Sequence, residues 1–352
     1  MSQALAEEIL ARIREHGPLP VSEYMRLALF HPQHGYYRTH AAIGARGDFI
    51  TAPEISQMFG ELIGLWAAEL WAALGRPPTL HLVELGPGRG TLMADALRAA
   101  AKASPDFRAA IDLHLVEINP ELRRRQGEAL AAARPHWHDD LGTVPTGPAI
   151  VIANEFFDAL PVDQVVRTEA GWRQRVVEHA DGRLVFGHGD PVAKPAEAPV
   201  GSVFELSPER EMIAARLFER IASQRGAALI IDYGSMSALG DSLQAVRAHQ
   251  KVEPLAEPGD ADLTAHVDFS RLTALAGAAG AVAHGPVPQG AFLRRLGIAA
   301  RAATLLRAAT PAQKRDIEQA MRRLIEPDEM GTLFQALAVT APGLPIPPGF
   351  DV

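Results

Sequence analysis

The pattern of apolar positions between residues 79 and 154 is typical of strands and helices in alternation. Residues 80–85 form a short apolar run, and the alanine-rich segment from Thr91 to about residue 101 has helical character. The same pattern follows a second time: an apolar run at 112–118 predicts a strand, and the segment after it predicts a helix that continues to residue 133. This alternation predicts βαβ units, and therefore a parallel sheet with right-handed crossovers. The further strands that we predict here are a short one that begins at His136 and closes on Asp139 and Asp140, and a fourth at 149–153.

The segments on either side of this region have patterns of their own. Leu5, Ile9 and Ile13 lie on one stripe of a predicted helix at 4–15. Between residues 162 and 206 the period changes to two, which predicts an antiparallel meander inserted after the fourth core strand. The remaining elements that we predict are a helix at 24–30 capped by Ser22, a helix at 54–74, strands at 164–167, 174–178 and 183–186, a helix at 207–225, a fifth core strand at 228–233, an irregular stretch at 241–258, helices at 270–279, 289–308 and 311–325, and final strands at 282–287 and 333–340, the last of them antiparallel.

A glycine turn follows the first core strand. Glycines at 86, 88 and 90 separate this strand from the helix that begins at Thr91. Because glycine has no Cβ atom, the backbone of such a turn can approach a ligand closely, and the next helix offers its N-terminal N–H groups. The turn therefore predicts a nucleotide-type pocket, with Gly86, Gly88, Gly90 and Thr91 as cofactor-binding residues.

The spacing of these glycines bears on which ligand is bound. The dinucleotide fingerprint requires Gly or Ala one position later than Gly90, where this chain has Thr91, and this disfavours NAD. A phosphate-binding NTPase loop requires a lysine after its last glycine, and none follows Gly90. A ligand with an adenosine end, a cationic or zwitterionic tail and no phosphates remains, and Glu84 is a suitable neighbour for such a tail. S-adenosyl-L-methionine, which leaves as S-adenosyl-L-homocysteine, matches this description.

Acidic residues close the second and third core strands. Glu117 ends the strand beside the glycine turn, where a carboxylate can accept both hydroxyl groups of a ribose. Asp139 and Asp140 end the short third strand. We assign the adenine amino group to Asp140, with Asp139 as the rival residue.

The fourth core strand leads directly into the segment 154–158, which reads NEFFD. In a doubly wound sheet this segment lies at the carboxyl edge, next to the cofactor. Methyl transfer requires a positioned acceptor atom, and carboxylates can hold a guanidinium group and take its proton. Asn154, Glu155 and Asp158 are therefore our candidate catalytic residues, with Glu155 first. The alternative is that Asn154 and Asp158 cap a following helix while the two phenylalanines pack in the core.

Composition narrows the classes of function. The 352 residues carry 42 acidic and 34 basic side chains, an excess of acid that disfavours a broad nucleic-acid interface. There are no cysteines, which excludes disulfides, thiolate zinc sites and a cysteine nucleophile. No apolar run approaches the length of a membrane span. We predict no metal site: His31 and His34 read as a polar turn, and His136 and His138 as surface or pocket-wall residues.

Long runs of residues identify a family resemblance. Besides the glycine turn, four segments carry it: 47–61 (GDFITAPEISQMFGE), 154–161 (NEFFDALP), 231–234 (IDYG) and 262–269 (DLTAHVDF). Together they are similar to the MidA-like family of class I S-adenosyl-L-methionine-dependent methyltransferases, which includes a mitochondrial respiratory complex I assembly factor that methylates protein arginine. The resemblance extends from about residue 24 to residue 337.

The resemblance implies a fold and further site residues. It implies an α/β class I methyltransferase fold with a seven-stranded, mostly parallel sheet. It places Asp48, Thr51 and Gln57 at the cofactor pocket. It also places Asp262, His266 and Asp268 on the acceptor side, with His266 as a proton acceptor. We expect an N-terminal helical segment with the cofactor loop at 1–75, the first half of the core at 76–161, a β-meander cap that recognises the substrate at 162–206, and the second half of the core at 207–352.

The function that we expect is arginine methylation of a protein. The resemblance implies that the substrate is a subunit of the quinone-binding arm of complex I, methylated during assembly. Two alternatives stay open, a non-catalytic assembly chaperone that binds the cofactor structurally and a small-molecule methyltransferase. A Ser-His-Asp hydrolase is disfavoured because Gly234 and Ser235 are not part of a G-x-S-x-G elbow. Since no basic, acid-poor leader opens the sequence, we expect a bacterial cytoplasmic protein or a mature chain of the mitochondrial matrix.

Overall fold

The structure is a computed structural model, and it describes residues 2–39 and 51–351. The chain divides into two compact units. The core unit consists of Ile50–Phe156, Ala214–Gly234 and Arg271–Val352, and the accessory unit of Met1–Phe49, Phe157–Ile213 and Ser235–Ser270. The predicted division after residues 75, 161 and 206 partitions the chain differently and stays a prediction.

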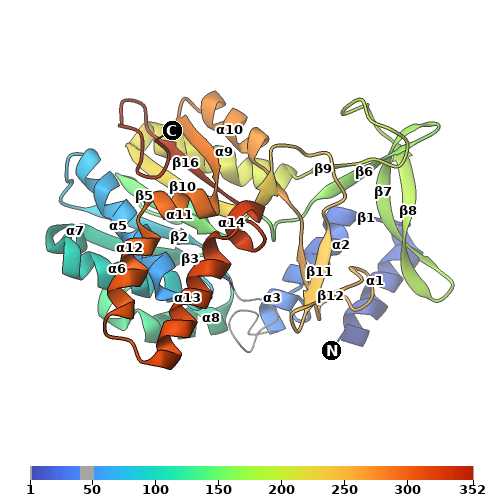
Figure 1. The fold of residues 1–352 in the computed structure, drawn as a ribbon. Helices are drawn as coiled ribbons and strands as arrows, with labels where there is room; N and C mark the ends of the chain where they lie inside the picture. The colour runs from blue at the N-terminus through green and yellow to red at the C-terminus, as the bar shows by residue number, and fades with distance from the viewer. Residues whose placement is uncertain (1, 40–50, 352) are drawn as a thin grey trace. The chain divides into compact units, whose positions relative to one another are not determined.

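A twisted sheet forms the centre of the core unit (Figure 1). Its strand order is β15-β16-β10-β5-β2-β3-β4. Neighbouring strands from β10 to β4 run parallel, whereas β16 is antiparallel to both β10 and β15. This arrangement confirms the predicted class I methyltransferase fold, including its antiparallel final strand. The bounds are β2 Leu80–Leu85, β3 Ile111–Val116, β4 His136–His138, β5 Ala149–Asn154, β10 Gly226–Ser235, β15 Val282–Pro288 and β16 Phe334–Thr340.

Helices pack on this sheet around one apolar core. The core combines buried residues of the central strands with Trp66 of α5, Leu97 of α6 and Phe292 of α11. The bounds are α4 Ala52–Ile55, α5 Gln57–Ala73, α6 Thr91–Ala103, α7 Pro105–Ala110, α8 Pro120–Ala129, η1 Ala131–Ala133, η2 Leu141–Thr143, α9 Pro208–Gln224, α10 Phe269–Ala278, α11 Gln289–Arg295, α12 Ile298–Leu306, α13 Pro311–Ile325 and α14 Met330–Leu333.

Two of the predicted helices are interrupted. The predicted helix at 54–74 is two helices, because Ser56 is extended (φ −160°) and its hydroxyl caps α5 by accepting from Met58 N at 3.2 Å. The predicted helix at 289–308 also divides, since Gly297 adopts a left-handed conformation (φ 89°) between α11 and α12. Both breaks leave the apolar helical period intact on either side, so the period alone could not reveal them.

The accessory unit has its own sheets and its own core. The meander strands β6 and β8 pair antiparallel with β7, as predicted. Tyr24, Val162 and Val177 belong to the apolar core of this unit. Two predictions are wrong here: α2 has Pro20 as its N-cap, with the Ser22 hydroxyl donating to Asp163 instead, and the stretch at 241–258 contains two strands. The bounds are α1 Ser2–His16, β1 Leu19–Pro20, α2 Val21–Phe30, α3 Tyr36–Thr39, β6 Asp163–Thr168, β7 Gly171–Ala180, β8 Arg183–Pro191, β9 Val203–Leu206, β11 Gln244–Arg247, β12 Gln250–Val252, β13 Asp262–Thr264 and β14 Val267–Asp268.

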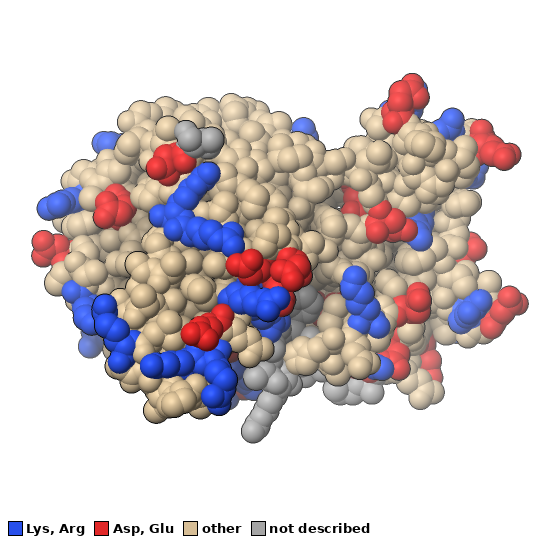
Figure 2. All heavy atoms as spheres, in the orientation of Figure 1, with Lys and Arg blue, Asp and Glu red and all other residues tan. Residues whose placement is uncertain are grey.

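The surface of the core unit mixes charges of both signs. Basic and acidic side chains are interspersed on the face that Figure 2 shows, and pairs such as Arg294–Glu326 join them at 3.0 Å. A nucleic-acid interface normally presents one sign of charge over a wide area. Among the described helices, none combines the length and the apolar character that a membrane crossing requires.

Candidate functional site

The glycine turn at the end of β2 follows a path that side chains would obstruct. Gly86, Gly88 and Gly90 all have positive φ values, of 62°, 54° and 81°. A Cβ atom on Gly86 would lie 2.9 Å from Cδ2 of Phe156, whose ring comes from the end of β5. The turn therefore depends on glycine both for its conformation and for the close approach of the aromatic ring.

Glu54 of α4 holds this turn from the side. Its Oε1 accepts a short hydrogen bond from the Thr91 hydroxyl at the start of α6, and its Oε2 accepts from Arg89 Nη1 at 3.2 Å. Thr51, a predicted cofactor residue, is the N-cap of α4 and is partly buried. The predicted cofactor residues Thr51 and Thr91 are thus joined through one short helix.

Glu84 is a buried carboxyl group next to the turn. Its exposed fraction is 3%, and burial raises its pKa to about 8. Among the described residues, none donates a hydrogen bond to its Oε2 atom. A buried acceptor of this kind is costly unless a ligand supplies a donor or a positive charge.

Glu117 and the glycine turn are linked by Gln126, a residue that the sequence analysis missed. Glu117 Oε1 accepts from Asn119 N at 2.8 Å, and Oε2 accepts from Gln126 Nε2 at 3.3 Å. The same amide group donates to Gly88 O at 2.7 Å, while Trp137 Nε1 donates to Gln126 Oε1 at 2.9 Å. Gln126 and Leu122, four residues apart, are the buried residues of α8, and this spacing was a signal available in the sequence.

Asn154 and Glu155 come together at the end of β5. Glu155 has a φ of 51°, and its N–H donates to Ile231 O on the neighbouring strand at 2.9 Å. Its Oε1 accepts from Ala52 N at 2.9 Å and from Asn154 Nδ2 at 3.0 Å. A left-handed conformation is unfavourable for a residue other than glycine, so the strand ends and the start of α4 must hold it in place.

The predicted capping alternative for Asn154 and Asp158 is wrong. Residues 155–162 are all described, and they connect β5 to β6 through turns without a helix for either side chain to cap. Asn154 is buried, and no described residue donates a hydrogen bond to its Oδ1 atom. This amide oxygen is therefore a second buried acceptor, after Glu84 Oε2, in the same unit.

These residues fit S-adenosyl-L-methionine. The molecule offers an ammonium group, ribose hydroxyls and an adenine amino group, all of which donate hydrogen bonds. The core unit offers the acceptor atoms Glu84 Oε2 and Asn154 Oδ1, the buried carboxylate of Glu117, and a turn with glycine at three of its positions. Glu84 Oε2 and Asn154 Oδ1 have no hydrogen-bond donor among the described residues, and a ligand rich in donors can supply one to each.

Three residues predicted for the pocket are exposed, and two of them have other partners. Asp140 is exposed, and its Oδ1 accepts from Gly142 N at 2.5 Å as the cap of η2. Its rival Asp139 is also exposed and pairs with Arg123. Gln57 is exposed at the first position of α5. Asp48 lies outside the described residues.

Asp158 and His266 belong to the accessory unit, where Arg210 joins their backbones. Arg210 Nη2 donates to Asp158 O at 2.9 Å, and Nη1 donates to His266 O at 2.6 Å. Burial raises the pKa of the Asp158 carboxyl to about 6, against the opposing effect of the Arg210 charge. Burial, with Arg210 and Lys251 nearby, lowers the pKa of His266. The two neighbours of His266 in the motif are engaged locally, Asp262 by the Tyr37 hydroxyl and Asp268 by Ser270.

Comparisons with known proteins agree with the fold and with the type of cofactor. The model of a family described as S-adenosyl-L-methionine-dependent methyltransferases matches residues 62–287. The chain is 39% identical to a mitochondrial protein arginine methyltransferase NDUFAF7 homolog of Drosophila melanogaster, over 96% of this chain and 84% of that protein. It is 36% identical to the mitochondrial protein arginine methyltransferase NDUFAF7 of Homo sapiens, over 95% of this chain and 83% of that protein.

A solved structure extends the comparison to a bound cofactor product. A protein from Burkholderia thailandensis, with S-adenosyl-homocysteine bound in its crystal structure, aligns with a TM-score of 0.85 and 31% identity. The alignment covers 100% of this chain and 93% of that chain. Because the alignment includes the full length of this chain at 31% identity, the two proteins are similar over the whole fold.

Proposed function

The chain belongs to the S-adenosyl-L-methionine-dependent methyltransferase family, and from this premise we propose that it methylates an arginine side chain of a protein substrate. The observation that carries the proposal is the carboxylate of Glu155, held by Ala52 N and Asn154 at a strand end of the core unit. The names of the relatives, which are protein arginine methyltransferases, supply the acceptor type.

The residues around the glycine turn bind the cofactor in this proposal. Glu84 receives the ammonium group, because an ion pair compensates the burial of its carboxylate. Glu117, oriented by Gln126 and Asn119, receives the ribose hydroxyls. Bound S-adenosyl-L-methionine supplies an electrophilic methyl group on sulfur. The further proposed cofactor residues are Gly86, Gly88, Gly90, Thr91, Thr51, Gln57 and Asp140.

Glu155 holds the acceptor guanidinium group. Its Oε1 atom is fixed by two donors, so its position is set before a substrate binds. A charge-assisted pair between carboxylate and guanidinium is strong and directional. In the transfer, the methyl–sulfur bond breaks, a carbon–nitrogen bond forms, and the guanidinium nitrogen loses one proton to a base.

The other proposed catalytic residues are Asn154 of the core unit and Asp158 and His266 of the accessory unit. The lowered pKa of His266 keeps its imidazole neutral near pH 7, which is the form that accepts a proton. Asp158 is the second carboxylate. We propose a complex I quinone-arm subunit as the substrate and the inserted β-meander as the surface that recognises it. The corresponding location is the bacterial cytoplasm, or the mitochondrial matrix for a processed chain.

The test is transfer of labelled methyl groups from S-adenosyl-L-methionine to the proteome of a strain that lacks this protein. Wild type, Glu155→Gln and the exposed control Glu128→Gln are compared, and the labelled residue is mapped by mass spectrometry. We expect label on an arginine of one respiratory-chain subunit, a loss of about 100-fold or more in Glu155→Gln, and no change in the control. Cofactor affinity, measured by calorimetry, should be retained in both variants.

Each other outcome contradicts a named part of the proposal. Unchanged turnover in Glu155→Gln removes this residue from the mechanism. Cofactor binding without label in any fraction favours an assembly chaperone. Label in the small-molecule fraction favours a metabolite methyltransferase.

A further inference from the structure

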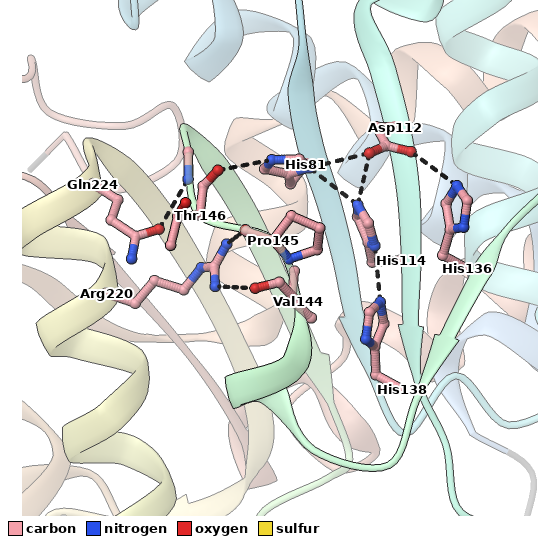
Figure 3. A network of polar contacts seen from close by, with 11 residues as sticks. His81, Asp112, His114, His136, His138, Val144, Pro145, Thr146, Arg220 and Gln224 are labelled. Carbon is pink, nitrogen blue, oxygen red and sulfur yellow. Dashed lines mark hydrogen bonds and ion pairs between the residues drawn. The ribbon is translucent and has the colours of Figure 1, made fainter.

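One face of the core sheet carries an unusual group of histidines near its β4 edge. Strand pairing aligns His81 of β2 with Asp112 of β3, and His114 of β3 with His136 of β4. Side chains two residues apart along a strand lie on the same face, so His138 joins them. Figure 3 shows these five side chains turned toward one another.

Three ligand-type atoms converge within this group. His114 Nε2 lies 3.0 Å from His81 Nδ1 and 2.9 Å from Asp112 Oδ2. The third separation, from His81 Nδ1 to Asp112 Oδ2, is 3.3 Å. Ligand atoms at 2.0–2.1 Å from a tetrahedral Zn²⁺ ion lie about 3.3 Å from one another. The observed triangle is within a few tenths of an ångström of that spacing.

The surrounding hydrogen bonds fix the tautomer of His81. Its Nε2 atom lies 3.3 Å from Thr146 O, and a carbonyl oxygen can only accept. The proton of a neutral His81 is therefore on Nε2, and its Nδ1 presents a lone pair to the triangle.

The same reasoning fixes His138 and then His114. The Thr143 hydroxyl donates to Asp140 O at 2.8 Å, so it must accept from His138 Nδ1 at 2.9 Å. His138 Nε2 then accepts from His114 Nδ1 at 2.9 Å, which leaves a lone pair on His114 Nε2. In this tautomer three acceptor atoms face one another, an arrangement that a cation between them satisfies.

We propose that His81 Nδ1, His114 Nε2 and Asp112 Oδ2 bind one Zn²⁺ ion. A shared proton is the other cation that could fill the triangle. It would place a positive imidazolium on His114 or on His81, whose exposed fractions are 1% and 8%, at a cost in desolvation. A metal ion avoids this cost because every ligand stays in its usual protonation state.

The outer contacts are those of a protein metal site. Metal-binding histidines typically donate their second N–H to a carbonyl or another fixed acceptor, as His81 and His114 do here. The loop that carries Thr146 is in turn fixed by α9: Arg220 donates to Val144 O at 3.0 Å, and Gln224 accepts from Gly147 N at 3.0 Å (Figure 3). A fourth ligand is supplied by water or by His136, whose Nε2 lies 3.4 Å from Asp112 Oδ1.

The position in the sheet indicates a structural role for the ion. His81 is near the start of β2, whereas the glycine turn follows its other end. The ion would join β2 to β3, and His114 and Asp112 connect it to the edge strand β4 through His138 and His136. This inference is therefore independent of the proposed methyl transfer.

The test uses the purified full chain, dialysed against chelator and then loaded with Zn²⁺ alone. Bound metal is counted by plasma mass spectrometry, and affinity is measured by competition with a fluorescent zinc chelator. We expect one Zn²⁺ per chain in the wild type and a loss of affinity of about 10-fold or more in His81→Gln and in Asp112→Asn. The matched control is His284→Gln, a half-buried sheet histidine bonded to Thr340 at 3.0 Å, which should bind zinc as the wild type does.

Two further measurements distinguish a loss of zinc binding from a loss of folding in a variant. Circular dichroism and S-adenosyl-homocysteine affinity verify that each variant is folded, and Asp112→Asn preserves the shape of the side chain. Absence of stoichiometric zinc in the wild type overturns the proposal, and so does equal zinc binding by Asp112→Asn or an equal loss in His284→Gln.

Discussion

At the scale of single residues, the burial of Glu84 has a consequence for stability. Its pKa is about 8 in the folded protein, against an ordinary value of 4.5. Between these values the folded chain keeps a proton that the unfolded chain loses, so folding takes up a proton. The free energy of unfolding of the cofactor-free protein should therefore fall as pH rises through this window, by at most about 1.4 kcal/mol per pH unit.

Replacing Glu84 by Gln should remove this pH dependence. Glutamine has nearly the same shape and does not titrate, so the Glu84→Gln variant should lose less stability than the wild type between pH 5 and pH 8. Urea unfolding at several pH values measures the difference. Parallel stability curves for the two proteins would show that the Glu84 carboxyl group is not held neutral in the fold.

The glycine turn permits a second test at this scale, because Gly75 provides a matched control. Gly86 and Gly75 both have positive φ values, but a Cβ atom on Gly75 would meet nothing within 4 Å, whereas one on Gly86 would meet Phe156. Each change to alanine should cost about 1 kcal/mol of backbone strain. Only Gly86→Ala should also weaken S-adenosyl-homocysteine binding in calorimetry. Equal affinities in the two variants would mean that the turn is not part of the pocket.

At the scale of elements, the break at Ser56 separates a short helix from a long one. α4 carries Glu54, which holds the glycine turn, while α5 packs in the core. In a single helix through 54–74, the direction of Glu54 relative to the core residues of α5 would be fixed, because consecutive residues rotate by about 100° around the helix axis. The break at Ser56 removes this constraint, so Glu54 contacts the glycine turn while α5 packs in the core.

The cap at Ser56 should make a measurable contribution to stability. Its hydroxyl accepts from Met58 N, so Ser56→Ala should lower the free energy of unfolding by about 1 kcal/mol. Ser104 is also an N-cap residue, of α7, but makes no side-chain cap hydrogen bond. Ser104→Ala should therefore have a much smaller effect in the same urea titration. A comparable loss in both variants would contradict the capping role of Ser56.

At the scale of the whole molecule, two units with separate apolar cores share one chain. The proposed cofactor residues Glu84 and Glu117 and the proposed acceptor-binding residue Glu155 all belong to the core unit. A ligand that binds only the folded form of a unit increases the free energy needed to open it, by about 2.7 kcal/mol at 100 times the dissociation constant.

Saturation with S-adenosyl-homocysteine should therefore slow amide hydrogen exchange mainly in the core unit. Peptides from β2, α6 and the end of β5 should gain protection, and peptides from β7 and β8 of the accessory unit should change less. Deuterium uptake measured by mass spectrometry compares them. Equal protection in the β7 and β8 peptides would show that the two units open together.

Local sequence patterns predicted most of the architecture. The strand at 80–85 and the helix at 311–325 have the predicted bounds, because each combines a clear apolar period with strong end signals. The helix predicted at 54–74 was wrong, because one extended residue does not disturb the helical period around it. The predicted roles of the site residues stay predictions.

Contacts between distant segments depended on the tertiary structure. The sequence by itself determined the sheet class, the glycine turn and the acids at the strand ends, since these follow from the order of residues along single elements. Only strand register brought His81, Asp112 and His114 together, and only the docking of α8 placed Gln126 between Gly88 and Glu117. Such groups come from separate elements, and their side chains meet only when packing fixes how each element is shifted and rotated against its neighbours.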